Sequence, residues 1–108
     1  MASSRSYNII MNKDVLIRRL ASLKPELNAE GVSHLALFGS RARGDHSSQS
    51  DIDLLLEVEP ASRFSILNLV GVEQIVEREM GMTANVFMRR SLDREFKASI
   101  ENDLIEVF

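Results

Sequence analysis

Apolar residues recur at helical spacing over the first part of the chain and predict two helical segments there. The first begins near Lys13, with Asn12 or Asp14 as its N-cap, and its apolar positions are Val15, Leu16, Ile17, Leu20 and Leu23. Pro25 then opens a second short turn or helix, because proline suits the first helical position, and this segment ends near Gly31.

Two more helices are predicted in the second half of the chain. Ser62 is the expected N-cap of a long helix that runs to about Met80, where Gly81 suits a left-handed C-cap. The inner side of this helix is expected to hold Phe64, Leu67, Val70, Ile75 and Val76. Ser91 is the expected cap of a final helix, whose apolar residues are Phe96, Ile100 and Leu104.

Three short apolar stretches predict strands. Residues 34–38 are apolar and end at Gly39, and residues 84–88 form a similar stretch. Residues 52–58 alternate, so that Ile52, Leu54, Leu56 and Val58 share one face and Asp51, Asp53, Leu55 and Glu57 the other. Residues 41–50 form a polar loop that can open with one helical turn. This loop connects the first two strands, so we expect them to pair as an antiparallel hairpin. The order α-β-β-α-β-α predicts an α+β (α/β-like) fold, in which helices flank a small mixed sheet.

Length and composition place this pattern in one folded domain. The chain has 108 residues, of which 44% are apolar, and we assign residues 12–108 to the domain. Residues 1–11 are either a loose extension or an extra strand. Cysteine is absent, which excludes disulfides and thiolate metal sites and suits a reducing cytoplasm. No apolar run approaches the roughly 20 residues that span a bilayer, so we expect no membrane segment.

The net charge of −3 argues against nucleic acid as the main ligand, because such binding neutralises phosphates with Lys and Arg. The positive charges are nevertheless clustered. Arg41 and Arg43 lie in one short polar segment, and Arg89 and Arg90 are adjacent. Two small basic clusters suit a small polyanion better than a duplex.

The most informative stretch runs from Gly39 to Asp53. Asp51 and Asp53 are two apart on a strand, so their carboxylates leave the same face and repel each other unless a cation lies between them. Carboxylate oxygens suit Mg²⁺, which takes one or two protein carboxylates and completes its shell with water and phosphates. This pair is therefore the predicted metal site.

The start of the same stretch suits a phosphate group. Gly39 lets the backbone turn close to a ligand, and Ser40 offers a hydroxyl and a backbone N–H at the beginning of a turn. Arg41 and Arg43 can reach the same anion. The hairpin is expected to bring Ser40 and the aspartates together, so that a triphosphate is held by Ser40 and bridged to the carboxylates through the metal.

The runs GSRARG and SDIDLLLE resemble the signature of the DNA polymerase beta-like nucleotidyltransferase superfamily, and are most similar to its minimal nucleotidyltransferase (MNT) branch. The resemblance covers nearly the whole chain. It implies Mg²⁺ dependence, ATP as donor, and nucleotidyl transfer to an acceptor. It also implies an antitoxin paired with a HEPN-domain partner, of which a tyrosine hydroxyl is the acceptor.

One position departs from the family pattern. Active members carry a third aspartate on the next strand, where this chain has Asn85. An amide oxygen can coordinate Mg²⁺, but it brings no negative charge and cannot accept a proton from the attacking hydroxyl. Glu57, on the face of the acidic pair, and the more distant Asp93 are candidate substitutes for the missing carboxylate.

Alternatives remain at several of these positions. Alone, Asp51 and Asp53 would suit an ordinary solvated strand start, and Arg41 and Arg43 would suit surface charge. Asn85 favours a binding module that neutralises or assists a partner by contact. The small size also suits a catalytic subunit that depends on a separate substrate-binding protein, so a homo- or hetero-oligomer is expected.

Overall fold

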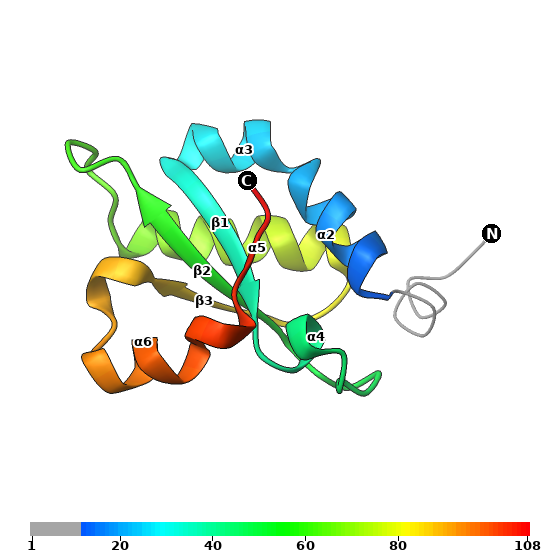
Figure 1. The fold of residues 1–108 in the computed structure, drawn as a ribbon. Helices are drawn as coiled ribbons and strands as arrows, with labels where there is room; N and C mark the ends of the chain where they lie inside the picture. Colours follow the sequence, from blue (N-terminus) through cyan, green and yellow to red (C-terminus); the bar gives the residue numbers. More distant parts are fainter. Residues whose placement is uncertain (1–11) are drawn as a thin grey trace.

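A mixed four-stranded sheet organises the computed structural model, which describes residues 12–108 (Figure 1). The strands are β1 (Val32–Phe38), β2 (Ile52–Val58), β3 (Ala84–Met88) and β4 (Ile105–Glu106), in the spatial order β3-β2-β1-β4. β1 is antiparallel to β2 and β4, whereas β2 and β3 are parallel. The predicted hairpin and mixed sheet are therefore confirmed, and the suggested extra strand in residues 1–11 lies outside the described residues.

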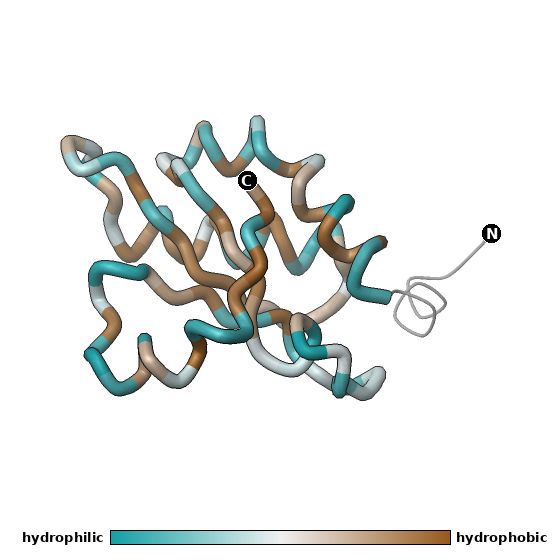
Figure 2. The backbone as a smooth tube through the Cα atoms, in the orientation of Figure 1, coloured by the Kyte–Doolittle hydropathy of each residue, from teal (hydrophilic) through white to brown (hydrophobic). Residues whose placement is uncertain are grey.

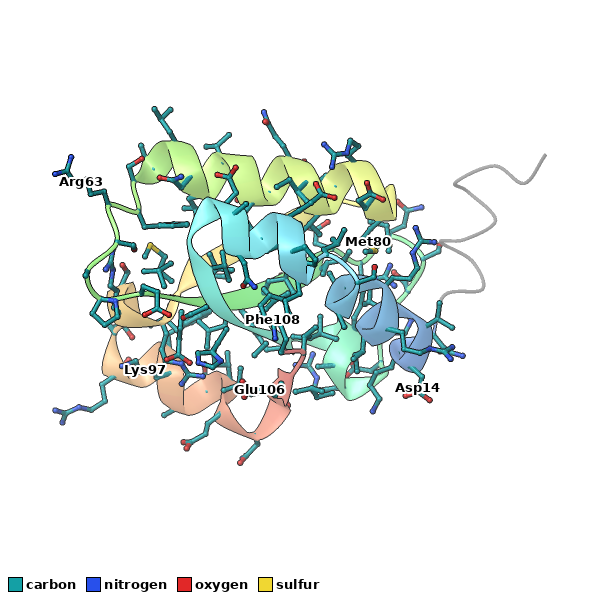
Figure 3. All side chains as sticks on the ribbon, turned by 90° about the horizontal axis from the view of Figure 1, so that it is seen from above. Asp14, Arg63, Met80, Lys97, Glu106 and Phe108 are labelled. Atoms are coloured by element: carbon teal, nitrogen blue, oxygen red, sulfur yellow. The ribbon has the colours of Figure 1, made fainter. Side chains whose placement is uncertain are left out.

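The C-terminal end of the chain supplies β4, a strand that we did not predict. β4 pairs with the middle of β1, and the hydrogen bonds continue beyond it, since the Leu35 N–H donates to the Phe108 carbonyl over 3.1 Å. The Phe108 ring, labelled in Figure 3, lies 5.7 Å from the Lys24 ammonium, which stabilises the end of the chain. β1 also begins two residues earlier than predicted, at Val32.

Three helices cover one face of the sheet: α2 (Lys13–Ala21), α3 (Lys24–Glu30) and α5 (Ile66–Met80). The side chain of Asn12 accepts a hydrogen bond from the Val15 N–H, so Asn12 and not Asp14 is the N-cap of α2. Pro25 lies in the first turn of α3, and Gly31 ends that helix with φ of +108°. Both ends of α3 match the prediction.

The main core lies between these helices and the sheet. β2 contributes alternate residues, Ile52, Leu54 and Leu56, and all three are fully buried. The helices contribute Leu16, Leu20, Leu27, Val72, Val76 and Met80. Figure 2 shows hydrophobic residues concentrated on the strands and polar ones in the outer loops. Burying each such aliphatic side chain stabilises the fold by about 1.5–3 kcal/mol.

The opposite face carries α6 (Arg94–Ile100) and a smaller cluster of buried residues: Ala36, Phe38, Leu55 and Ile100. Three aromatic rings pack together beside them, with centroid separations of 5.7 Å for Phe38–Phe87, 6.0 Å for Phe38–Phe96 and 5.5 Å for Phe87–Phe96. Leu55 is on this face and Leu54 on the other, as the alternation along β2 predicts.

The start of α5 differs from the prediction. α5 begins after Ser65, whose N–H donates to the Asn68 side chain over 3.0 Å, and not after Ser62. The predicted inner residues Leu67 and Val70 are 79% and 40% exposed. The face of α5 that packs into the core instead holds Val72, Val76 and Met80. The end of α5 at Gly81, with φ of +68°, was predicted correctly.

The last helix also begins later than predicted. Arg89–Ser91 forms a 3₁₀ turn, and Asp93, not Ser91, caps α6 by accepting from the Phe96 N–H over 2.8 Å. α6 ends at Ile100, so Leu104 lies beyond it, after a second 3₁₀ turn. Between residues 12 and 108 no helix is both long and apolar enough to cross a membrane.

Candidate active site

Two aspartates and an asparagine meet at one end of the β2–β3 pair. Asp51 directly precedes β2, and Asp53 pairs with Asn85 across the parallel ladder. The Asn85 amide nitrogen donates to the Asp51 Oδ2 over 3.1 Å and to the Asp53 Oδ1 over 3.0 Å. The structure therefore brings together the acidic pair and the third position that the sequence singled out, and the amide group bridges two negative charges.

Gly39 brings the other half of the motif against this cluster. It follows β1 with φ of +79°, a conformation that strongly favours glycine. A Cβ at this position would overlap the Asp53 Oδ2 and lie 3.2 Å from its Cγ. The bare backbone of Gly39 thus allows the carboxylate to pack against the end of β1, so the glycine and the aspartate are in contact despite the residues between them.

Ser40 opens a single helical turn, α4 (Ser40–Arg43), as the sequence suggested. Its carbonyl accepts from the N–H groups of Gly44 and Asp45, over 2.9 and 3.1 Å, and Gly44 ends the turn with φ of +86°. Within residues 12–108 the Ser40 hydroxyl makes no hydrogen bond. A half-buried hydroxyl next to Gly39 is therefore available to a ligand.

Arg41 points into the loop that follows α4. Its side chain is 1% exposed, and it donates from Nε to the Ser50 carbonyl over 3.0 Å and from Nη2 to the Ser47 carbonyl over 3.4 Å. Burial lowers the pKa of Arg41, and the carboxylate of Asp51 opposes that shift. The alternative that Arg41 is surface charge is wrong: it holds the peptide that leads into Asp51. Whether its buried and unpaired Nη1 reaches a phosphate stays a prediction.

Arg43 is exposed and held between two carboxylates. Its Nε lies 3.0 Å from the Asp45 Oδ2, and its Nη1 lies 2.9 Å from the Asp103 Oδ2. These hydrogen bonds raise the pKa of Arg43. A triphosphate would have to compete with both carboxylates for this guanidinium group, so the structure agrees better with the surface-charge alternative here.

The sequence pattern of the nucleotidyltransferase domain family matches residues 16–107, nearly all of the chain that the structure describes. The chain belongs to this family. Two relatives support the assignment. A Methanocaldococcus jannaschii protein, MJ1379, provisionally named a protein adenylyltransferase, is 31% identical over 96 residues, which cover 88% of this chain and 93% of the relative. The protein adenylyltransferase MntA of Thermococcus cleftensis is 28% identical over 89 residues, which cover 82% and 88%.

Solved structures share the fold of this nucleotidyltransferase domain. One provisionally described as a minimal nucleotidyltransferase superposes with a TM-score of 0.74 at 23% identity, and covers 89% of this chain and 96% of that chain. A chain from the complex of a tri-AMPylated Shewanella oneidensis HEPN toxin with its MNT antitoxin gives 0.65 at 12%, covering 89% and 71%. A chain from a toxin–antitoxin structure with AMP-PNP gives 0.66 at 15%, covering 82% and 72%.

The donor atoms at the acidic end of this nucleotidyltransferase domain fit a small, hard cation. Asp51 and Asp53 offer carboxylate oxygens on one side of the sheet, and Asn85 adds an amide group within hydrogen-bond distance of both. In the described part of the chain, no three His, Cys, Asp or Glu residues gather at one point. A metal here would therefore have two protein charges and a neutral third donor, which suits Mg²⁺ with water and phosphate completing its shell.

The two proposed substitutes for a third carboxylate are engaged elsewhere. Glu57 lies at the far end of β2, 3.3 Å from the Arg89 Nε, and Asp93 caps α6. Sequence reasoning also missed Asp103, which binds Arg43 from a position 60 residues away. No local pattern signals that contact, because it depends on how the C-terminal segment returns to β1.

Proposed function

We propose that this nucleotidyltransferase moves AMP from ATP to a protein hydroxyl in an Mg²⁺-dependent reaction. The observation that supports this proposal is the close approach of Gly39, the neighbour of Ser40 in the chain, to the Asp53 carboxylate. The naming of relatives as protein adenylyltransferases supports the type of acceptor. The AMP-PNP in a structural relative supports an adenine nucleotide as donor.

In this proposal Asp51 and Asp53 hold the metal, and Asn85 is the third ligand through its carbonyl oxygen. Bound Mg²⁺ would neutralise charge on the phosphates and orient them, which is most of the catalysis in phosphoryl-type transfer. Gly39 and Ser40 hold the triphosphate through the free hydroxyl and nearby backbone. Arg41 contributes mainly by keeping the loop before Asp51 in place, while Arg43 reaches the phosphates only after it leaves Asp45 and Asp103.

The acceptor oxygen attacks the α-phosphorus of ATP, a new P–O bond forms, and pyrophosphate leaves with the electrons of the broken bond. The hydroxyl proton must be taken up as this happens. The Asn85 amide cannot accept it, so an aspartate of the pair or solvent does. Transfer is therefore expected to be slower than with a third carboxylate.

We further propose that the acceptor is a tyrosine of a HEPN-domain partner, and that the chain acts as the antitoxin of such a pair. The complex between an AMPylated HEPN toxin and an MNT antitoxin, whose structure shares this fold, supports this choice. The domain is also small, which leaves recognition of the acceptor to a surface contact between two proteins.

A second function is favoured by one specific observation. The Asn85 amide nitrogen already bridges both carboxylates, so the acidic end holds together without a cation. A fold stabilised in this way can serve as a binding module that neutralises a partner by contact, with little or no transfer of AMP.

The direct test is to incubate the chain with labelled ATP, Mg²⁺ and the product of the adjacent gene, and then to measure label on the partner. Transfer by the wild-type chain that is lost in Asp53→Ala supports the enzyme. No transfer by either chain, with a tight complex between the proteins, would establish the binding module instead.

Asn85→Asp separates a slow enzyme from a disabled one. Three carboxylates would repel one another, so we expect the metal-free variant to lose about 1–2 kcal/mol of unfolding free energy and to regain it with Mg²⁺. A gain of about 10-fold or more in transfer rate would show that residue 85 limits the chemistry. Thermal melts with and without Mg²⁺, beside the label assay, measure both effects.

A further inference from the structure

A second polar site lies at the other end of the β2–β3 pair. A pocket of about 400 Å³ opens where these strands end, between the Arg89–Ser91 turn and α6. Its apolar lining comes from Leu56, Val58, Pro60 and Met88, and its charged lining from Glu57, Arg89, Arg90 and Lys97. The volume is within the range of ligand-binding clefts.

The pocket carries an excess of positive charge on a chain whose net charge is −3. Glu57 approaches the Arg89 Nε at 3.3 Å, but this nitrogen is buried and makes no hydrogen bond. Arg90 and Lys97 are exposed, and neither forms an ion pair with a carboxylate among residues 12–108. Three cations against one carboxylate, with one N–H group unsatisfied, fit a ligand with more than one negative charge.

The charged residues of the pocket follow the same two strands as the acidic end, whereas Leu56, Val58 and Met88 of its apolar lining belong to the opposite face of the sheet. Side chains alternate along a strand, so Glu57 shares a face with Asp53, while Arg89 follows directly after β3, the strand that holds Asn85. Each pair is four residues apart, which is roughly 13 Å along an extended strand. A ligand in the pocket therefore lies within a few residues' length of the proposed site of AMP transfer.

The aromatic cluster shows which kind of ligand can reach both sites. Phe38, Phe87 and Phe96 pack against each other on the sheet between the two ends, so a nucleotide held by Asp53 cannot extend directly along this face into the pocket. β3 is an edge strand of the described sheet, and a polypeptide can pass along its outer side. The apolar lining beside the cations suits a segment of mixed acidic and apolar side chains.

We propose that this basic pocket docks an acidic segment of the protein acceptor, a few residues from the hydroxyl that receives AMP. The proposal rests on the proposed function, because it assumes a protein acceptor, and it adds how that acceptor is recognised. Rim charges of this kind set the rate and selectivity of association, and their effect falls with added salt.

The test uses the full chain and two peptide probes with a fluorescent label. One probe carries a run of glutamates about four residues from a tyrosine, matching the separation of the two sites, and the other carries glutamines instead. The test variant is Arg90→Glu with Lys97→Glu, and its matched control is Lys13→Glu with Arg18→Glu in α2. Both pairs are exposed and change the net charge equally. Figure 3 shows Lys97 and Asp14, a neighbour of Lys13, at opposite ends of the molecule.

We expect the acidic probe to bind the wild-type chain and the control with similar affinity, and to bind the pocket variant about 10-fold more weakly. The glutamine probe should bind all three chains weakly. Equal binding of the two probes, or equal losses in the two double variants, would overturn the proposal. Loss of Mg²⁺–ATP binding in the pocket variant alone would overturn it too, because the pocket would then belong to the nucleotide.

Failure of the proposed function has a different signature. Mg²⁺–ATP binding and AMP transfer to the product of the adjacent gene are measured on the same three chains. If no chain transfers AMP while the acidic probe still distinguishes the pocket variant from its control, the transferase proposal fails and the docking surface remains.

Discussion

The two faces of the sheet differ in how completely they are covered. One face packs against α2, α3 and α5 through a continuous apolar core, whereas the other has four buried residues and one short helix. The polar residues of the candidate site lie on the second face, at the end of the β2–β3 pair where Asn85 contacts Asp51 and Asp53. Neighbouring residues of β2 therefore have different tasks: Leu54 is fully buried in the main core, and Asp53 joins the acidic end. Two adjacent residues of one strand therefore serve stability and the proposed chemistry separately.

Asp53→Asn should have the largest effect of these variants. It should lower AMP transfer and leave the free energy of unfolding nearly unchanged. The substitution keeps the shape of the side chain but removes a proposed metal-binding charge, so we expect AMP transfer to fall at least about 100-fold. The unfolding free energy should change by less than about 1 kcal/mol, because repulsion from Asp51 is relieved. Asp14→Asn, in α2, is the control and should retain full transfer. A loss of stability like that of a core variant would contradict the comparison of the two faces.

Leu54→Ala is the complementary change on the other face. Deleting most of a fully buried side chain should lower the unfolding free energy by about 2–5 kcal/mol, through lost burial and the cavity left behind. Chemical denaturation measures this loss. Transfer per folded molecule should stay near the wild-type value at a temperature where the variant remains folded, and a large drop there would show that the two faces are coupled.

Gly39→Ala tests the contact between Gly39 and Asp53, where one substitution should lower both stability and AMP transfer. Alanine is strained at φ of +79°, and its Cβ would displace the Asp53 carboxylate, so stability should fall by about 2–3 kcal/mol, and transfer should fall with it. Gly44→Ala is a close control: its φ is +86°, but no atom lies within 4 Å of the added carbon. It should cost about 1 kcal/mol and spare transfer. Equal effects of the two variants would mean that the contact with Asp53 is unimportant.

Leu67→Gln should have the smallest effect. The side chain is 79% exposed at the start of α5, so the unfolding free energy should change by less than about 0.5 kcal/mol. Val76→Ala, on the buried side of the same helix, should cost clearly more in the same denaturation experiment. A large loss from Leu67→Gln would support the helix face that the sequence first suggested.

Periodic segments were predicted well because their signal is local. The alternation along residues 52–58 predicted both the limits of β2 and the faces to which Leu54 and Leu55 belong. The family resemblance, and not the periodicity, singled out Asn85 as the third position, and the structure brings its amide group within hydrogen-bond distance of the acidic pair. The roles assigned to these residues stay predictions.

The errors occur where several residues offer the same local signal. Ser62 and Ser65 both suit an N-cap, and Leu67 and Val72 are both apolar, so the local pattern decides neither the start of α5 nor the residue that faces the core. β4 has only two residues, too few for a period, and it exists because β1 has an edge to pair with. The burial of Arg41 has no sequence signal at all, since it depends on carbonyl groups that the folded loop directs inward.

The two hydrogen bonds from Asn85 to Asp51 and Asp53 affect how readily this site can bind a cation. An amide presents a donor on one side and an acceptor on the other, and half a turn about its last side-chain bond exchanges the two. The same residue can thus restrain both carboxylates before a cation arrives and coordinate that cation afterwards. Because the two carboxylates are already held in place, they lose little conformational entropy when the metal binds. This saving offsets the weaker electrostatic attraction of a site that has two carboxylates and an amide.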